Sequence, residues 1–133
     1  MKIVYSFLIL ISISFISCEK IEGPGGTSSI SGKIWIEDYT SDFTVLKAEY
    51  WAEEEDVYII YGNDTIHSNR NRTNFDGSYW FQYLNKGTYT IYAYSRDSSA
   101  VNPSSSGRIP VKVKVTIVDS GEDYAAPQIT ILK

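Results

Sequence analysis

TNFDGSYWFQYLNKGTYTIYA, residues 73–93, is the stretch that decides the fold of this chain. Asp76-Gly77 is a turn signal, because glycine adopts a positive φ without a steric penalty. In the residues that follow, aromatic and β-branched side chains alternate with polar ones, a pattern typical of strands. The stretch therefore predicts two strands that flank a compact corner.

Side-chain alternation gives each of these two strands an inner face. Tyr79 and Phe81 point to one side, Leu84 fills the corner, and Tyr89 and Ile91 point inward on the second strand. We expect the Tyr89 hydroxyl to bind nearby backbone, as the tyrosine corner of sandwich domains does.

The rest of the chain carries further strand signals separated by turn residues. Every second residue from Ile30 to Ile36 is isoleucine or glycine, which predicts a first strand with Lys33 and Trp35 on its outer face. Isoleucine and valine alternate with other residues from Ile109 to Ile117 and predict a long strand. The remaining predicted elements are Val57–Tyr61, a turn at Gly62–Asp64, a short edge strand at Thr65–His67, a surface loop at Asp97–Gly107 and a last strand at Gln128–Leu132.

These elements indicate an all-β fold, a β-sandwich of about seven strands in two sheets. No helix is firmly predicted. Thr44–Glu55 is the one stretch with helical character.

The motif within residues 73–93 resembles that of a known family. Its pattern, Thr-x-x-Asp-Gly-x-Tyr-x-Phe followed by Leu-x-x-Gly-x-Tyr, is similar to the pattern of carboxypeptidase regulatory-like domains. The resemblance implies a prealbumin-like (transthyretin-like, Ig-like) sandwich, related in architecture to collagen-adhesin B-type repeats, and an accessory role without catalysis. Asp38–Asp56, longer and acidic, stands where that family commonly has a Gly-x-Pro segment.

The first residues of the chain predict export. Lys2 precedes an almost continuously apolar run, Ile3–Phe15, which is shorter than the ~20 residues of a spanning helix and is followed by small residues, as a cleaved signal is. Phe15-Ile16-Ser17-Cys18 resembles the lipobox of bacterial lipoproteins, in which the cysteine carries diacylglycerol. We therefore expect lipidation of Cys18 and anchoring to the cell envelope, at the outer membrane.

The chain then divides into three parts. Residues 1–17 are the predicted signal peptide, residues 18–28 the lipidated cysteine and a flexible glycine-rich tether, and residues 29–133 the sandwich domain. Lys and Arg number 12 against 16 Asp and Glu, which gives a formal net charge of −4. This acidic balance argues against nucleic acid as a partner and leaves the lipid as the expected contact with the membrane.

Residues that catalyse reactions or bind metals are sparse in this sequence. His67 is the sole histidine and Cys18 the sole cysteine, so a multi-histidine metal site cannot form within one chain. Asp38, Asp42 and the run Glu53–Asp56 could gather oxygen ligands for Ca²⁺, but they lack regular spacing, and a solvated acidic loop is favoured. We predict no catalytic residue, no metal and no cofactor, and we interpret His67 as a solvated turn residue.

The strand register places tyrosines on one outer face of the sandwich. If the branched residues of the two central strands point inward, then Tyr58, Tyr92 and Tyr94 point outward, where they could stack on sugars or anchor a protein. The favoured alternative is that Asp38–Asp56 folds over this face and completes the core, since large apolar patches are uncommon on monomers.

Asp64-Thr65-Ile66 resembles the Asp-(Ser/Thr)-aliphatic acceptor of O-glycosylation in Bacteroidota. Thr65 is therefore a candidate modification site, at a predicted turn of an exported protein. The lipoprotein signal, the abundant tyrosine and the low content of basic residues suit that phylum.

The sequence as a whole predicts a lipid-anchored module with a non-enzymatic role in protein interaction or envelope structure. The alternative is a carbohydrate-binding accessory lipoprotein that uses the outward tyrosines. An enzyme would instead need a concave pocket that contains His67 or converging carboxylates. The expected partners are the membrane, through the lipid, and another envelope protein or a glycan.

Overall fold

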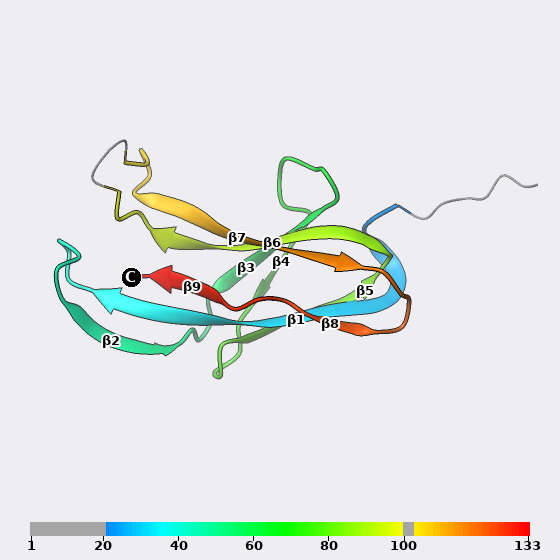
Figure 1. Cartoon of the computed structure of the whole chain (residues 1–133), viewed down its shortest axis with the longest axis horizontal. Helices are drawn as coiled ribbons and strands as arrows, with labels where there is room; N and C mark the ends of the chain where they lie inside the picture. Colours follow the sequence, from blue (N-terminus) through cyan, green and yellow to red (C-terminus); the bar gives the residue numbers. More distant parts are fainter. Residues whose placement is uncertain (1–20, 100–102) are drawn as a thin grey trace, which may run out of the picture.

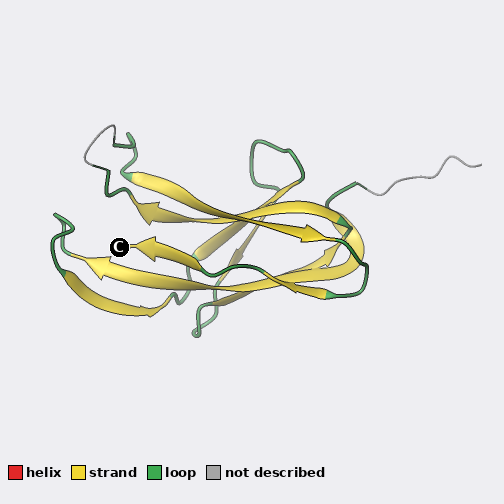
Figure 2. Cartoon of the chain, in the orientation of Figure 1, coloured by secondary structure: helices red, strands yellow, loops and turns green. Residues whose placement is uncertain are grey.

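The computed structural model describes residues 21–99 and 103–133 (Figure 1). The predicted signal peptide and Cys18 lie outside the described residues. The described part of the chain consists of strands and loops without a helix (Figure 2). It accordingly holds no helix that could span a membrane.

Two sheets pack face to face, which confirms the predicted all-β sandwich (Figure 1). The four-stranded sheet has the order β4-β3-β6-β7, formed by Asn69–Arg72, Asp56–Tyr61, Gly87–Arg96 and Arg108–Ile117. The five-stranded sheet is built around β1, Pro24–Tyr39, which pairs with β2 (Leu46–Trp51), β5 (Ser78–Leu84), β8 (Asp123–Ala125) and β9 (Ile129–Leu132).

The long strand β1 organises its sheet in two halves. Its first half pairs antiparallel with β5 and parallel with β8, and its second half pairs antiparallel with β2 and parallel with β9. At the midpoint, the Ile34 N–H donates to the Gly77 carbonyl and the Ile34 carbonyl accepts from the Ala52 N–H, both at 3.0 Å. One residue thus joins the start of β5 to the end of β2.

The predicted tether is too long, because β1 begins at Pro24. The Gly23 N–H donates to the Tyr89 hydroxyl at 3.0 Å, so the chain is held to the sandwich before this strand starts. A side chain on Gly26 would overlap the backbone of Leu84. The glycines that suggested a flexible linker permit a close approach between strands instead.

Two predictions of local structure are wrong. Within Thr44–Glu55, the stretch with helical character, the chain forms strand β2, because pairing with β1, as between Trp35 and Trp51, outweighs local propensity. Thr65–His67 is a loop, and the edge strand starts only at Asn69. Within the described residues, strands β2 and β8 raise the count from about seven to nine.

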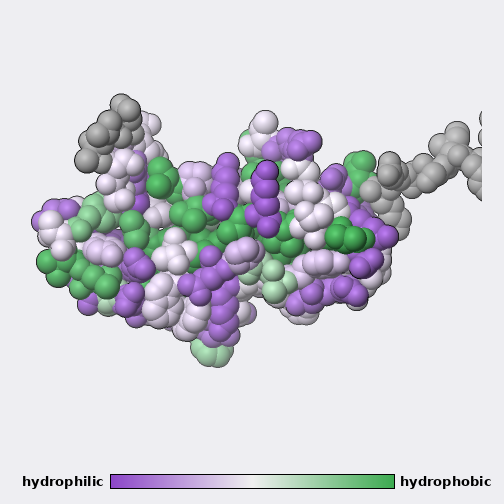
Figure 3. Space-filling view, viewed as in Figure 1, coloured by the Kyte–Doolittle hydropathy of each residue, from purple (hydrophilic) through white to green (hydrophobic). Residues whose placement is uncertain are grey.

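The core lies between the two sheets and is made by the alternation predicted from the sequence. On the side that Figure 3 shows, hydrophobic residues gather along the middle of the molecule, between the layers. In β7 burial increases along the strand, from Ile109 at 38% exposed to Ile117 at 2%. The other buried residues include Ile30, Ile34, Ile36, Val57, Ile59, Tyr79, Phe81, Leu84, Tyr89, Ile91, Ile129 and Ile131.

The Tyr89 hydroxyl closes the corner between β5 and β6, as predicted. It donates to the Asn85 carbonyl at 2.7 Å and accepts from the Gly23 N–H at 3.0 Å. Because the hydroxyl satisfies backbone groups from two distant parts of the chain, it fixes the entry into β1 against the corner. Burial raises the pKa of Tyr89, so this donor stays protonated over a wide pH range.

The Asp76-Gly77 turn is confirmed and needs glycine for two reasons. Gly77 has a φ of 77°, and its N–H donates to the Asn74 carbonyl at 3.0 Å. The Asp76 carboxylate accepts from the Ser78 hydroxyl at 2.5 Å and from the Ser78 N–H at 3.1 Å, which lowers the Asp76 pKa. A Cβ atom on Gly77 would also lie 2.8 Å from the Ile34 carbonyl oxygen, at the midpoint of β1.

We expect Gly77→Ala to destabilise the protein by more than Gly107→Ala. Both glycines have a positive φ, 77° and 68°, so both variants incur the left-handed penalty of about 1–2 kcal/mol. Only the variant at Gly77 adds a backbone clash, because nothing lies within 4 Å of a Cβ atom on Gly107. Urea unfolding measures both losses, and equal losses would contradict the structural role given to Gly77.

Candidate functional site

The three predicted tyrosines form a cluster on the four-stranded sheet. Tyr58 and Tyr92 are cross-strand partners whose rings stack 5.0 Å apart at an angle of 15°. Tyr94 lies edge-on to both, at 5.7 and 5.6 Å. Because the rings cover one another, Tyr92 is only 7% exposed, and Tyr58 and Tyr94 are partly buried. The cluster therefore offers little free ring face to a sugar.

The Asp38–Asp56 segment does not cover these tyrosines, which corrects the favoured prediction. Its strand β2 pairs with β1 in the opposite sheet, where Tyr50 and Trp51 are exposed. The loop after β3 supplies a smaller contact, since the His67 ring lies 4.8 Å from that of Tyr58. His67 is exposed and packs on an aromatic ring, outside any cluster of acidic groups.

Basic side chains surround the tyrosine cluster. Arg70 and Lys112 stand opposite Tyr58 and Tyr92 in the strand register, and the Arg108 guanidinium lies 5.8 Å from the centre of the Tyr94 ring. Five of the 12 Lys and Arg residues thus gather on this face, and two of them, Arg70 and Arg72, are paired with Asp56 at 3.8 and 3.1 Å. The five are Arg70, Arg72, Arg108, Lys112 and Lys114.

We expect the stability of the protein to fall as pH rises above about 10, because tyrosine in an unfolded chain ionises near that value. Burial, followed by the neighbouring Tyr94 and Tyr58, raises the pKa of Tyr92 to about 12. The folded state therefore retains protons that the unfolded state has lost. The stabilisation is complete below pH 10 and disappears as pH approaches the folded value.

Urea unfolding across this alkaline range, with phenolate absorbance as a second signal, measures the effect. Tyr92→Phe should make the alkaline loss less steep. A wild-type unfolding midpoint that stays constant from about pH 9 to pH 12 would contradict the raised pKa.

All three tryptophans lie on the outer face of the five-stranded sheet. Trp35 and Trp51 are cross-strand partners, and Trp80 stands opposite Ser31. Since Ile30, Ile34 and Ile36 of β1 point into the core, the odd-numbered residues of this strand point outward. Trp51 is 37% exposed and Trp80 is 53% exposed.

The tryptophans form two rows separated along β1. The rings of Trp35 and Trp51 meet edge to face at 4.8 Å. Trp80 lies four β1 residues away, which corresponds to about 13 Å along a strand. Lys33 lies between the rows, with its ammonium 4.6 Å from the centre of the Trp51 ring and 3.8 Å from the Asp76 carboxylate.

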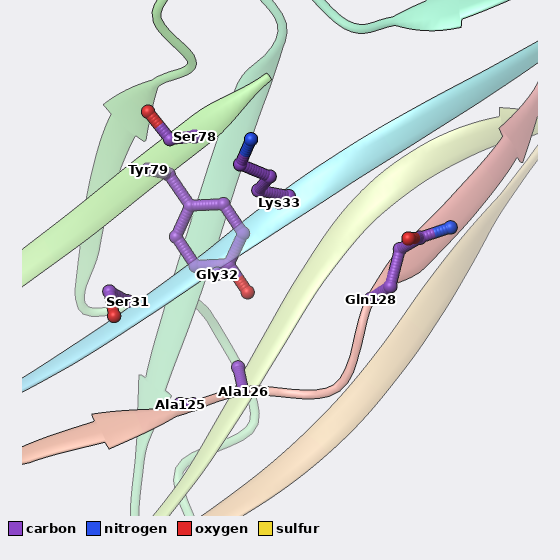
Figure 4. A pocket seen from close by; sticks show the side chains of 8 residues that line it. All are labelled: Ser31, Gly32, Lys33, Ser78, Tyr79, Ala125, Ala126 and Gln128. Carbon is purple, nitrogen blue, oxygen red and sulfur yellow. The ribbon is translucent and has the colours of Figure 1, made fainter. Parts of the chain in front are cut away.

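A hollow of about 300 Å³ opens on the side of β1 that pairs with β8 and β9, across this strand from β5 and β2 (Figure 4). It arises because β8 pairs with β1 only as far as Ser31 and β9 begins to pair at Ile34. The chain between β8 and β9 passes Gly32 and Lys33 without a ladder partner there. The lining residues are Ser31, Gly32, Lys33, Ser78, Tyr79, Ala125, Ala126 and Gln128.

The sequence did not reveal this tryptophan face as a site. Alternation placed Trp35 and Lys33 outward, but Trp51 was assigned to the segment expected to cover the other sheet. The outward position of Trp35 was the available signal. Its partner could not be known without the pairing of β1 with β2, which long-range contacts determine.

Asp38, Asp42 and Glu55, from the predicted acidic set, are held in separate interactions. Asp38 lies 3.2 Å from the Lys47 ammonium, and Glu55 lies 2.6 Å from that of Lys133. Asp42 accepts hydrogen bonds from neighbouring threonine groups, which lowers its pKa to about 2. Within residues 21–99 and 103–133, no group of three His, Cys, Asp or Glu side chains is arranged to hold a metal ion.

Cys18 and Thr65 are the remaining predicted sites. Cys18 is outside the described residues, so its lipidation stays a prediction. Thr65 lies exposed in the loop between β3 and β4, and its glycosylation likewise stays a prediction.

Comparisons with known proteins assign no family to the chain. No family model matches it, and neither does any curated protein. Among solved structures, it is similar to a protein from Pseudomonas aeruginosa called a "putative carbohydrate binding protein", with 14% identity and a TM-score of 0.46. The match covers 84% of this chain and 91% of the other. At this level of similarity, no ligand transfers from one protein to the other.

Proposed function

We propose that this protein is a lipid-anchored, non-catalytic module of the cell envelope that binds glycans on the outer face of its five-stranded sheet. The observation that carries the proposal is the placement of Trp35, Trp51 and Trp80 on one face, beside a hollow. Large aromatic side chains are costly to leave in water, and their gathering outside the core is typical of binding surfaces.

The geometry favours an extended ligand with both apolar and polar surfaces. Two aromatic rows about 13 Å apart can each support the apolar face of a sugar ring. Ser31, Ser78 and Gln128 line the hollow. The two serine hydroxyls donate to Asp123 and Asp76, so a ligand would use their oxygen lone pairs and the Gln128 amide. This proposal keeps the carbohydrate-binding alternative drawn from the sequence and moves its site to the opposite sheet.

Two sequence features support the envelope location and the accessory role. The lipobox-like residues before Cys18 suggest export and lipid anchoring at the outer membrane. The motif in residues 73–93 resembles that of prealbumin-like accessory domains. Asp38 and Glu55 are paired with lysines, and His67 packs on Tyr58. These groups therefore serve contacts within the fold, which favours a binding role over a catalytic one.

Trp51→Ala and Trp80→Ala should each weaken glycan binding about ten-fold or more, because each removes one stacking surface. Tyr94→Ala is the matched control, since it removes an aromatic side chain from the opposite face. A glycan array followed by calorimetry on the bound glycans measures the effect. If glycan binding survives both tryptophan changes but is lost in Tyr94→Ala, the glycan site lies on the tyrosine cluster and the proposed site is wrong.

The four-stranded sheet favours a second candidate function, the binding of an acidic envelope protein. Asp56 pairs with Arg70 and Arg72, which leaves Arg108, Lys112 and Lys114 as the positive charges beside the tyrosine cluster, whereas the chain as a whole carries a net charge of −4. Such a concentration of positive charge next to aromatic rings is suited to a partner with an acidic surface.

The double variant Lys112→Glu/Lys114→Glu should abolish capture of an acidic partner, because it reverses two charges on β7, the edge strand beside the tyrosine cluster. Lys86→Glu, an exposed site outside β7, serves as the control. Pull-down of the lipidated protein from envelope extracts, at low salt and at about 1 M salt, where the Debye length is only ~3 Å, tests this. Capture that is insensitive to both salt and charge reversal would contradict the candidate.

A further inference from the structure

The Tyr79 hydroxyl is a buried polar group that the fold does not use. Tyr79 is 2% exposed, and its hydroxyl has no hydrogen-bond partner among the described residues. A Cβ atom on Gly32 would overlap this hydroxyl, so the oxygen occupies the space that the glycine leaves. A buried hydroxyl without a partner costs stability, and its retention calls for a reason beyond packing.

This hydroxyl is directed at the hollow of the tryptophan face. The Tyr79 ring crosses β1 at Gly32, and its oxygen points toward the segment Ala125–Gln128 (Figure 4). Burial raises the pKa of Tyr79, so the hydroxyl keeps its proton and can donate it to an acceptor. The hollow therefore has a hydrogen-bond donor buried directly beneath its floor.

The surroundings of this donor favour a small neutral group. Gly32, Ala125 and Ala126 give the hollow apolar surface, and Gln128 adds an amide. The Lys33 ammonium points away from the Tyr79 oxygen (Figure 4) and contacts Asp76 and the Trp51 ring. A carboxylate at the floor would therefore lack a cation, whereas a carbonyl next to a methyl group would match both the donor and the apolar surface.

We infer that this hollow binds the acetamido group of an N-acetylated amino sugar. The carbonyl oxygen of that group accepts from the Tyr79 hydroxyl, its methyl group packs on Ala125 and Ala126, and Gln128 is available to its N–H. Neighbouring sugar rings of the same glycan lie on Trp80 and Trp51. The inference rests on the proposed glycan-binding function and specifies the sugar that the central subsite takes.

The test compares two tetrasaccharides, one of β-linked N-acetylglucosamine and one of glucose with the same linkage. Calorimetry on the whole folded domain should show tighter binding of the N-acetylated one. Tyr79→Phe should weaken its binding about three- to ten-fold, in keeping with one lost hydrogen bond, and leave glucose tetrasaccharide binding unchanged. Ala125→Leu, which fills the hollow from its exposed rim, should remove the preference altogether.

Stability separates this role from a structural one. Tyr79→Phe removes an oxygen without a partner and should leave stability unchanged or higher, whereas Tyr89→Phe breaks two backbone hydrogen bonds and should lower it. Tyr89→Phe should leave the affinity for the N-acetylated ligand unchanged.

Several results would overturn the inference. Tryptophan-dependent binding of both tetrasaccharides with equal affinity, or unchanged binding by Tyr79→Phe, would refute the acetamido subsite and leave the glycan-binding function in place. A glycan array without any bound glycan would refute both. If N-acetylated ligands bind as inferred, pull-down on purified peptidoglycan and on chitin distinguishes a glycan of the envelope from one outside the cell.

Discussion

The Tyr89 hydroxyl ties the first residues of the sandwich to the corner between β5 and β6. It donates to Asn85 and accepts from Gly23, which lies 66 residues away along the chain. The Asn85 N–H in turn donates to the Gly23 carbonyl at 2.9 Å. Together these bonds set where β1 begins, and the position of β1 fixes the pairing of the four strands that it joins. Tyr79 offers a contrast, because its equally buried hydroxyl binds nothing in the fold.

The division of β1 into two halves is the structural origin of the candidate site. One strand pairs with β5 and β8 near its start and with β2 and β9 near its end, so the ladder is interrupted where one set of partners gives way to the other. On the β5 and β2 side, Ile34 and Gly77 close the junction tightly. On the β8 and β9 side, the junction leaves a hollow with Tyr79 beneath it.

The two outer faces of the sandwich differ in chemistry. The five-stranded sheet carries the three tryptophans, while the four-stranded sheet carries stacked tyrosines and five of the basic residues. Because Tyr58 and Tyr92 stack on each other, they cover the ring faces on which a sugar would have to stack. The tryptophan face keeps exposed ring surface and adds a concave site, which is why the proposed glycan site lies there.

The sequence by itself determined the sandwich class, the inward sides of the main strands, the Asp76-Gly77 turn and the Tyr89 corner, because alternation and turn chemistry are local properties. It also indicated an export signal that ends just before Cys18. Only the tertiary structure decided that β2 pairs beside Trp35, that β1 begins at Pro24 and that Gly32 leaves room for a buried hydroxyl. These features depend on which strands meet, and strand pairing is set by contacts between residues far apart in the chain, which no local pattern records.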